Sequence, residues 1–347
     1  MWVKGQITHD LEGATGGVKD LLDRAGQPHL FDRAYWFHML WTHNALGRQP
    51  LIARSWSKGA RGWLFLADQG NFKATALANY YTLAFRPIFT GSPDLQTRKA
   101  LLIATARRLR RRPMHITQIT LSPVPTDDGT ADLLAHSFRS AGWLVFRSEK
   151  TANWTVNVRD MSFDQYWDER PGALRSTFAR KAKKADIKTE IHTAFDPSIW
   201  AEYESIYAES WKPEEGSIVF LRALAETEGA AGALRLGIAR LDGVAIAAQL
   251  WTIEPDRAII HKLAYRASAA DLSPGTTLTA AMFRHVIDID HVPLIDYGTG
   301  DDRYKADWMD TRSVMEQIEC LNPLYASSWL RAGQNWLTRL ARRKPLA

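Results

Sequence analysis

A Gly-x-Gly step followed by acids, a tyrosine and a lysine is the most chemically suggestive feature of the chain. It lies in IDYGTGDDRYKADW, residues 295–308, directly after a short apolar run. Glycines after a strand can cradle a phosphate, but two adjacent acids here would repel one by about 1–4 kcal/mol per close pair. We therefore interpret the glycines as backbone-shaping residues, and expect Asp296, Tyr304 and Lys305 to face a bound molecule. The alternative is a structural ion pair of Lys305 with Asp301 or the aspartate after it.

Three polar residues within apolar runs are further candidates for binding a substrate. A buried amide needs partners, so Gln249 is expected to contact either a ligand or the neighbouring backbone. His261 and Lys262 are adjacent on a strand and must point to opposite faces, so one of them faces the cleft that the sheet borders. Neither has a second His, Cys or acid at ligand spacing, and we expect no metal.

The single cysteine, Cys320, lies in an apolar run and is expected to be a packed small hydrophobe, not a nucleophile. It cannot form an internal disulfide, which is typical of a reducing compartment. No run of about 18 apolar residues predicts a membrane span, and the N-terminus lacks the pattern of a secretory signal. We expect a cytoplasmic protein, with peripheral membrane contact left open.

Length and charge narrow the class of protein further. A chain of 347 residues with 46% hydrophobic and 24% charged residues indicates a globular protein of one large domain or two of about 150–200 residues. The net charge of +6 favours anionic partners. Basic residues gather at 106–113, at the end of a predicted helix, and at 175–186, on a helix that is either solvated or binds phosphates. They do not alternate with exposed aromatics, so DNA is not an expected partner.

The elements that would position the candidate residues occur in the same order twice. A hairpin, a third strand, a loop of about ten residues, a helix and a further strand fall at 50–121 and again at 234–298. This order predicts two related α/β (α+β) domains, residues 1–160 and 161–347.

Local signals support individual elements of the second half. Asp242-Gly243 is a strong hairpin turn because both residues tolerate a positive φ. Ser162 followed by Gln165 is a capping-box pattern. Asp196 before a proline predicts a helix N-cap.

This order of elements resembles the GNAT acyltransferase superfamily. More narrowly, four stretches resemble its CelD-like (cellulose-biosynthesis-associated) branch, which is similar to the Fem-type peptidyl transferases. They are residues 169–185, 234–251, 261–278 and 295–308, and cover most of 165–310. The resemblance implies two tandem GNAT-like domains, each a mixed, mostly antiparallel sheet flanked by helices. The first would be degenerate and would shape the acceptor cleft.

The resemblance also implies where a donor would bind. In GNAT domains the pyrophosphate of acyl-CoA lies on backbone amides of the loop between the fourth strand and the next helix. That loop is RASAADLSPGT here, residues 266–276, with a single glycine where the family has several, and with an added acid, Asp271. The residues implied to contact acetyl-CoA or another acyl-CoA are Arg266, Ser273, Gly275, Thr276 and Thr277.

The implied activity is acyl transfer to an amine or hydroxyl of a larger, glycan-like or peptide-like acceptor, such as a surface-polysaccharide or cell-envelope precursor; a small molecule is also open. Asp296 or Asp301 would take the proton, and Tyr304 would protonate the leaving thiolate. Lys305 would stabilise the oxyanion, by roughly 3–4 kcal/mol if preorganised, or hold an acceptor anion. One alternative is a Fem-like transferase that uses aminoacyl-tRNA, which the basic helix supports. The other is a non-catalytic binding protein that kept the fold.

Overall fold

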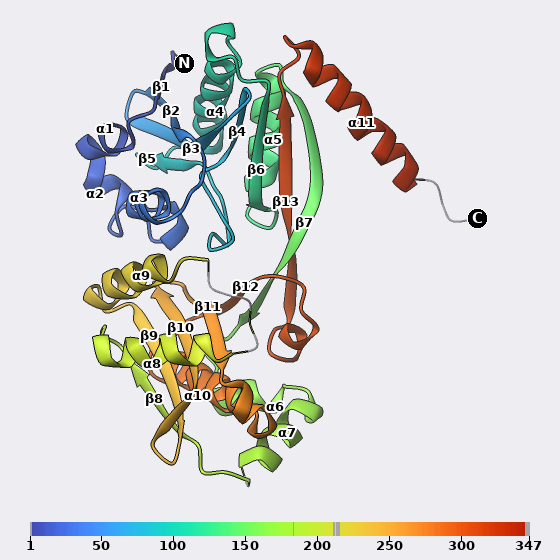
Figure 1. The fold of residues 1–347 in the computed structure, drawn as a ribbon. Coiled ribbons are helices and arrows are strands. Elements are labelled where there is room, and N and C mark those ends of the chain that lie inside the picture. Colours follow the sequence, from blue (N-terminus) through green and yellow to red (C-terminus); the bar gives the residue numbers. More distant parts are fainter. Residues whose placement is uncertain (1, 183, 211, 213–215, 344–347) are drawn as a thin grey trace. The chain divides into compact units, whose positions relative to one another are not determined.

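The computed structural model describes residues 2–182, 184–210, 212 and 216–343, and it divides into two compact units (Figure 1). Residues 1–151 and 313–347 form the first unit, and residues 152–312 form the second. The sequence predicts one boundary, between residues 160 and 161. The structure differs because its last strand pairs with a strand of the first unit, so the chain passes between the units twice.

The first unit is built on one mixed, mostly antiparallel sheet with helices against it. Its strands follow the order β1-β2-β3-β4-β6-β13-β7, with β5 beside β3, and only β4 and β6 are described as parallel neighbours. The helices and strands are β1 (Lys4–Thr8), α1 (Leu11–Thr15), α2 (Lys19–Leu22), α3 (Ala34–His43), β2 (Gln49–Ser57), β3 (Ala60–Gly70), β4 (Lys73–Ala76), β5 (Ile88–Thr90), α4 (Leu95–Leu109), β6 (Gln118–Pro125), α5 (Thr130–Ser140), β7 (Leu144–Asn157), β13 (Thr311–Leu321) and α11 (Ala326–Arg343).

The second unit repeats this plan with the end of β7 at one edge. Its strands follow the order β7-β12-β11-β10-β9-β8, in which only β11 and β12 are parallel. The helices and strands are α6 (Phe163–Asp168), α7 (Gly172–Ala182), β8 (Lys188–His192), α8 (Pro197–Ala208), α9 (Ile218–Ala230), β9 (Leu234–Leu241), β10 (Val244–Glu254), β11 (Arg257–Tyr265), α10 (Pro274–Asp288) and β12 (Leu294–Thr299), with short 3-10 helices η4 (Ala267–Leu272) and η5 (Arg303–Asp307).

The predicted repeat of element order is present. The antiparallel strands β2, β3 and β4 lead through α4 to β6, which is parallel to β4. In the same way β9, β10 and β11 lead through α10 to β12, parallel to β11. A crossover helix is needed because parallel neighbours cannot be joined by a tight turn. The tandem α/β (α+β) architecture is therefore confirmed.

The local signals of the second half form as predicted. Asp242 and Gly243 have φ values of 48° and 82°, as the hairpin turn between β9 and β10 requires. Ser162 and Gln165 form a complete capping box at the start of α6. The side chain of Asp196 accepts backbone N–H bonds at the start of α8.

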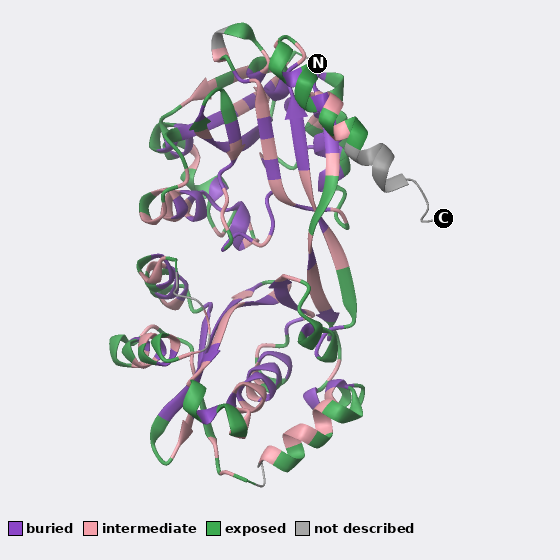
Figure 2. Ribbon diagram, turned by 45° about the vertical axis from the view of Figure 1, so that its right-hand side comes forward, coloured by how far each residue is buried: buried purple, intermediate pink, exposed green. Residues whose placement is uncertain are grey.

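Helices cover both faces of the second sheet. Figure 2 shows this sheet between α10 on one side and α8 and α9 on the other, with buried residues concentrated along its strands. The core on the α10 side joins Leu278, Met282 and Phe283 of α10 to Ile295 and Tyr297 of β12. The odd-numbered residues of β12 therefore face α10, and the even-numbered ones face away from it.

The remaining sequence features have clear places. Cys320 is fully buried in β13, and burial raises the pKa of its thiol well above the usual range, so the prediction of a packed small hydrophobe is confirmed. Helix α7 includes most of the basic segment 175–186, although Lys183 lies outside the described residues. Within the described residues, none of the helices combines the length and apolar character that crossing a bilayer requires.

Candidate active site

The two parallel strands of the second unit, β11 and β12, separate soon after they meet. Only two residue pairs join them, and the last is Ile259 with Asp296. Beyond this pair β11 continues to Tyr265, whereas β12 stays paired with β7, from Leu294 opposite Asn157 to Thr299 opposite Asn153. Across the gap beyond this pair, the facing edges of the two strands no longer satisfy each other's backbone groups.

A β-bulge lies at the start of the gap. The register of β11 with β10 shifts between Leu250 and Trp251, which leaves His261 as the extra residue of β11. Its ring nitrogen Nε2 lies 2.8 Å from Oγ1 of Thr252. Burial, with a smaller effect of the neighbouring Lys262, lowers the pKa of His261 to about 3, so the imidazole is neutral at physiological pH.

Asp296 lies at the point where the strands separate, and it is buried. Its Oδ1 accepts a hydrogen bond from Nδ2 of Asn153 at 3.0 Å and another from the N–H of Gly298 at 2.8 Å. Nη1 of Arg257 lies 4.0 Å from Oδ2. Burial raises the pKa of Asp296 above its ordinary value although these three partners each lower it. The site therefore holds a carboxyl that keeps its proton more readily than a surface aspartate.

Alternation along β12 separates Asp296 from Tyr304. Tyr297 belongs to the core beneath α10, so Asp296 points to the opposite face of the sheet. The ring of Tyr304 packs edge-on against Tyr297, with centroids 5.7 Å apart, and so lies on the α10 side. Burial raises the pKa of Tyr304 to about 12, with Asp302 adding to the effect. The structure thus brings Asp296 and His261 to one face and Tyr304 to the other.

Lys305 is buried and holds the Gly-x-Gly turn from within. Its Nζ donates to the carbonyl of Gly298 at 3.1 Å and to that of Thr299 at 2.8 Å, and lies 5.6 Å from the ring centroid of Tyr297. Burial lowers the pKa of Lys305, while Asp302 and two further acids raise it. The ammonium group thus contacts backbone carbonyls, and the nearby acids act on it by charge at longer range.

Asp301 has a different environment from Asp296. It is half exposed, and its carboxylate pairs with Arg312, with Nη2 2.8 Å from Oδ2. The indole N–H of Trp154 also donates to it, at 3.3 Å. The hydrogen bond from Arg312 lowers the pKa of Asp301. A carboxylate held ionised in this way is a weaker proton acceptor than Asp296.

Arg266, implied to contact a donor phosphate, is already bound within the protein. Its guanidinium donates to the carbonyl of Ala245 at 2.8 Å and to Oγ of Ser205 at 3.0 Å, and it forms an ion pair with Glu209. These contacts tie the residue after β11 to β10 and to the C-terminal end of α8. A phosphate would have to compete with Glu209 for this side chain.

The start of α10 offers few free hydrogen-bonding groups to the phosphates of an acyl donor. Ser273 has a left-handed backbone, with φ 52°, and its carbonyl accepts the N–H groups of Thr276 and Thr277 at 3.1 and 3.3 Å. Pro274 has no N–H to offer, and the backbone of Gly275 lies so close to a tyrosine ring that an added Cβ would be 3.2 Å from it. The first turn therefore presents threonine side chains and one early amide.

Gln249 is buried and supports the same helix from below. Its amide donates to Oγ1 of Thr279 at 2.7 Å and, at 3.4 Å, to the carbonyl of Gly275, and it accepts from the indole of Trp251 at 2.9 Å. The sequence leaves open whether Gln249 contacts a ligand or the protein itself. In the structure its described hydrogen bonds are all to the protein. Lys262, next to the bulge, is partly buried on β11 opposite Leu250.

Two residues of the site, Arg257 and Asn153, are absent from the sequence predictions, and a third, Lys181, lies in the basic segment 175–186, which the sequence predicts to be solvated or to bind phosphates. Arg257 and Asn153 contact Asp296 from separate strands, and Nζ of Lys181 on α7 donates to the carbonyl of Asp271 in the loop before α10. Two of the three carry a local signal: Arg257 lies two residues before the last β11–β12 pair, and Lys181 belongs to the basic helix α7. Asn153 has no such signal, because the fold brings it to Asp296 from a segment 143 residues earlier.

The comparisons with known proteins agree with this geometry. Residues 168–306 match the acetyltransferase (GNAT) domain family, the part of the chain that contains α7, the β9–β11 meander, α10, β12 and Lys305. No curated protein matches the sequence of the chain.

Solved structures extend the likeness over most of the chain. FemX aligns with a TM-score of 0.57 at 12% identity, over 83% of this chain and 96% of its own. A tandem GNAT protein from the clavulanic acid biosynthesis pathway aligns with a TM-score of 0.52 at 13% identity, over 91% and 98%. The C-terminal domain of a putative lysylphosphatidylglycerol synthetase from Agrobacterium fabrum aligns with a TM-score of 0.53 at 12% identity, over 80% and 84%. Identities this low show only that the chain shares its fold with these proteins.

Proposed function

We propose that this GNAT-fold chain transfers an acyl group from an activated carrier to an amine or hydroxyl of a larger acceptor, in the gap between β11 and β12. The observation that carries the proposal is Asp296, a buried carboxyl with a raised pKa at the residue where the strands separate. A raised pKa brings a carboxyl closer to the range in which general bases work at neutral pH. The acetyltransferase-family match of residues 168–306 supports this class of reaction.

In the proposed reaction the acceptor nitrogen or oxygen attacks the carbonyl carbon of the acyl group. The new bond to carbon forms as the bond from that carbon to the leaving sulfur or oxygen breaks. Asp296 takes the proton that the acceptor releases. Tyr304, on the α10 side, gives a proton to the leaving group and regains one from solvent. The two proton transfers thus use opposite faces of β12, which keeps the acceptor apart from the departing carrier.

Lys305 has a positioning role in this scheme. Two of its three N–H groups hold the carbonyls of Gly298 and Thr299, so the turn that connects Asp296 to Tyr304 has a defined shape. In the proposed scheme Lys305 would also donate its third N–H to the carbonyl oxygen of the acyl group, which becomes negative as the acceptor attacks.

The acceptor side of the site is polar. Asn153 donates to Asp296, and its own Oδ1 is buried without a hydrogen-bond partner among the described residues. A buried acceptor atom without a partner is costly unless a ligand or water satisfies it. An N–H or O–H group of an acceptor fits this position. We therefore propose an acceptor rich in such groups, such as a surface-polysaccharide or other cell-envelope precursor, modified in the cytoplasm.

The proposed donor is acyl-CoA, acetyl-CoA in the simplest case, with its phosphates at the start of α10. The helix dipole, the side chains of Thr276 and Thr277, and the cation of Lys181 at the adjoining loop favour an anion there. Ser273 and the amide of Gly275 complete this surface. Arg266 would contribute only after release from Glu209.

A second candidate donor is aminoacyl-tRNA, and α7 is the observation that favours it. The exposed cations Arg180 and Lys184 extend the positive charge of Lys181 beyond what one pyrophosphate needs. The few hydrogen-bonding groups at the start of α10 are a poor site for the phosphates of acyl-CoA, which also favours aminoacyl-tRNA. FemX, moreover, shares the fold of this chain. Affinity for a nucleic acid backbone would fall steeply with salt.

The deciding experiment compares the two donors on the intact chain. Acetyl-CoA and aminoacyl-tRNA are each titrated in a thermal-shift and a filter-binding assay, with the parent and with the double variant Arg180→Glu, Lys184→Glu. If acyl-CoA is the donor, acetyl-CoA raises the Tm and the double variant changes its Kd only a few-fold. If aminoacyl-tRNA is the donor, the double variant weakens binding at least tenfold. If neither donor binds, the transferase proposal is overturned and a non-catalytic binding protein remains.

A further inference from the structure

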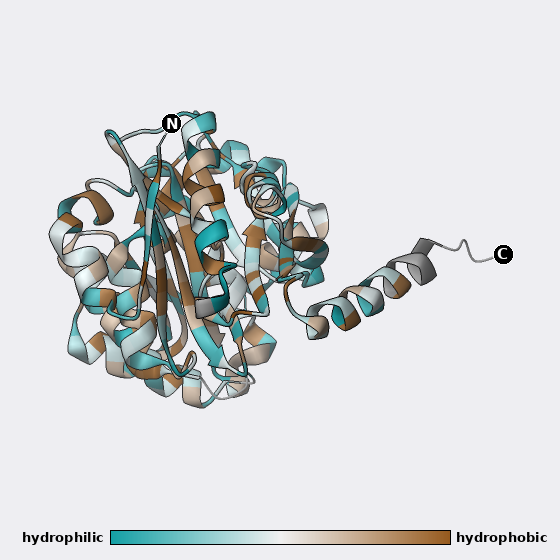
Figure 3. Ribbon diagram, turned by 90° about the horizontal axis from the view of Figure 1, so that it is seen from above, coloured by the Kyte–Doolittle hydropathy of each residue, from teal (hydrophilic) through white to brown (hydrophobic). Residues whose placement is uncertain are grey.

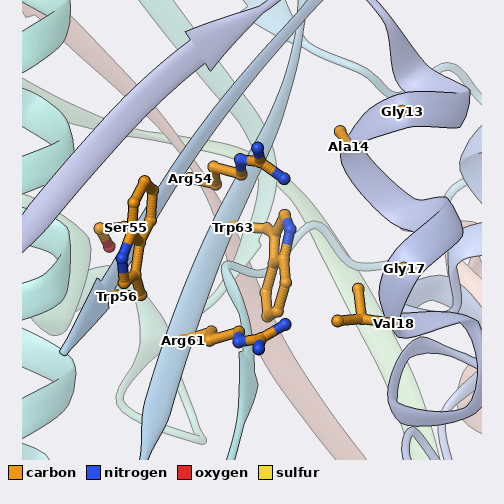
Figure 4. A pocket seen from close by; sticks show the side chains of 9 residues that line it. All are labelled: Gly13, Ala14, Gly17, Val18, Arg54, Ser55, Trp56, Arg61 and Trp63. Carbon is orange, nitrogen blue, oxygen red and sulfur yellow. The ribbon is translucent and has the colours of Figure 1, made fainter. Parts of the chain in front are cut away.

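The first unit contains a pocket that the proposed reaction does not use. It has a volume of about 250 Å³ and lies between small residues of α1 and the 3-10 turn after it, and one face of the β2–β3 hairpin (Figure 4). The lining residues that matter here are Gly13 and Gly17 on the helical side and Arg54, Trp56, Arg61 and Trp63 on the strands.

The strand face of this pocket alternates arginine with tryptophan. Arg54 lies opposite Trp63 in the β2–β3 register, and Trp56 lies opposite Arg61. Residues two apart on a strand share a face, so these four side chains form one two-by-two patch. Figure 4 shows the indole of Trp63 between the two guanidinium groups, on the side toward α1. The patch therefore combines flat apolar surface with positive charge.

The polar side chains of the pocket keep hydrogen-bonding capacity and positive charge that the protein does not neutralise. Trp63 is only 2% exposed, and its indole Nε1 has no hydrogen-bond partner within the described part of the chain. Arg54 donates to Oε1 of Gln6, at 3.1 and 2.6 Å, which is an uncharged partner. Arg61 is exposed, and no aspartate or glutamate lines the pocket. Two cations and a buried N–H donor thus converge without a counter-charge.

We propose that this pocket binds a compact organic anion, a single ring that carries a phosphate or a carboxylate. Guanidinium groups bind both oxyanions with paired hydrogen bonds, and the indole N–H supplies a further donor. The ring would stack against the indoles, as aromatic and cationic groups do at ligand sites. Gly17, where an added Cβ would meet nothing within 4 Å, leaves room on the helical side. This proposal does not depend on the proposed transfer reaction.

The test uses phenyl phosphate, benzoate and inorganic phosphate as probes of the full chain. Calorimetry gives each Kd, and the ¹⁵N–¹H signal of the Trp63 indole, assigned by its loss in Trp63→Phe, reports contact. We expect phenyl phosphate or benzoate to shift this signal and to bind at least tenfold more tightly than inorganic phosphate. Arg61→Gln should weaken binding at least tenfold. Arg107→Gln, which removes an exposed arginine of α4, should leave it unchanged.

The comparison of probes also identifies the anion. Tighter binding of phenyl phosphate points to a phosphate monoester, and tighter binding of benzoate to a carboxylate. The proposal is overturned if neither ring compound shifts the Trp63 signal, or if Arg61→Gln and Arg107→Gln weaken binding equally. Trp63→Phe removes the N–H together with part of the indole ring, so reduced affinity of a folded variant shows that the Trp63 side chain contributes to binding.

A different observation, on the C-terminal helix α11, carries a second inference. One side of this helix packs on the first unit: Ala332 is fully buried in a cluster with Phe146 and Leu321. Arg331 and Asn335 both donate to Glu319 of β13. This side is therefore fixed by both apolar and polar contacts.

The other side of α11 exposes large apolar side chains to water. Trp329, Leu330, Trp336 and Leu337 are 49%, 75%, 47% and 69% exposed. Gly333 lies between them at helical spacing, with open space around it. Figure 3 shows apolar and polar positions alternating along this helix. A contiguous ridge of this kind on a surface helix indicates a docking surface.

We infer that this ridge binds an anionic lipid surface. Tryptophan and leucine exposed together along one side of a surface helix are typical of helices that contact a membrane interface. The last nine residues, 339–347, contain four cations and no acid, which complements the negative charge of anionic lipids. A second copy of the chain would carry the same positive charge and would be repelled.

Vesicle co-sedimentation of the full chain tests this inference. We expect binding to phosphatidylcholine vesicles that contain phosphatidylglycerol, at least tenfold weaker binding to phosphatidylcholine alone, and release by salt. The double variant Leu330→Glu, Leu337→Glu should lose at least tenfold in partitioning, whereas Val244→Glu, at another exposed apolar site, should not. Equal partitioning of parent and double variant would overturn the inference. So would a concentration-dependent dimer, seen by sedimentation, that the double variant abolishes without any vesicle binding by the parent.

Discussion

The side-chain amide of Asn153 on β7 donates to the carboxylate of Asp296 on β12 across 3.0 Å, at the residue where β12 leaves β11. The two residues lie far apart in the sequence, and the bond lies on the sheet face turned away from α10. It orients the carboxylate while burial keeps its pKa high. This pair is the starting point for the predictions on acyl transfer.

Replacing Asp296 should remove the proposed base while leaving its shape. We expect Asp296→Asn to lower kcat/KM for acyl transfer by about 10²–10⁴-fold, the usual contribution of general base catalysis. Asp301→Asn, which alters an exposed carboxylate paired with Arg312, should change it less than about three-fold. The measurement is steady-state kinetics with the donor identified by binding. Equal losses in the two variants would remove Asp296 from its proposed role.

Asn153 should act through the pKa of Asp296, so its effect is read from a pH profile. The hydrogen bond from Asn153 lowers this pKa, and Asn153→Ala should therefore raise it further. Because the base works only when ionised, the acid limb of kcat/KM should move to higher pH, with a smaller change on the alkaline plateau. A uniform loss at all pH values, without any shift of the limb, would indicate a purely structural role.

The raised pKa of Asp296 also predicts how stability depends on pH. Above the ordinary aspartate pKa of about 3.9 the unfolded chain has released this proton, while the folded chain still holds it. The free energy of unfolding contributed by this group therefore falls as the pH rises through that window, and stays lower above the folded pKa. The stability of Asp296→Asn relative to the parent should rise over the same range. Urea unfolding at several pH values measures the difference; a constant difference contradicts the raised pKa.

Lys305 should stabilise the turn by its hydrogen bonds to backbone. Lys305→Met keeps the aliphatic stem but leaves the carbonyls of Gly298 and Thr299 without this donor, which should cost about 1–3 kcal/mol in the free energy of unfolding. Lys184→Met, at an exposed position of the same unit, should cost less than about 0.5 kcal/mol. Chemical denaturation of the three proteins provides the comparison, and equal stability would show that water replaces the lysine at no cost.

Arg170 should be the ion-pair residue on which the segment after η5 depends most. It is 3% exposed at its side chain, bonds Asp310 through two nitrogens at 2.7 and 3.1 Å, and donates to the carbonyl of Trp308 at 3.2 Å. Arg170→Ala should cost about 1.5–3 kcal/mol, the range for losing hydrogen bonds to a charged group, because its partner Asp310 is 53% exposed. Arg175→Ala breaks an exposed pair with Asp168 and should cost at most about 1 kcal/mol. Similar midpoints of thermal unfolding for both variants would contradict this difference.

Much of the architecture is readable from local patterns. The hairpin at Asp242-Gly243, the capping box of Ser162 and the repeated order of strands and helix each depend on neighbours within a few residues. The acids beside the Gly-x-Gly step argued against a phosphate loop, and in the structure Asp296 and Lys305 hold that turn by hydrogen bonds. Such features depend on residues close together in the sequence, so they can be predicted from the sequence alone.

The sequence by itself determined the tandem α/β plan and the segments that could carry chemistry. Only the tertiary structure decided that β13 and α11 belong to the first unit, because β13 pairs with β6 about 200 residues earlier in the chain. It also decided that Asp296 and Tyr304 point to opposite faces, that Arg266 is held by Glu209, and that Asn153 reaches the site. Each of these depends on a register or a contact between distant segments, which hydrophobic periodicity and turn chemistry do not encode.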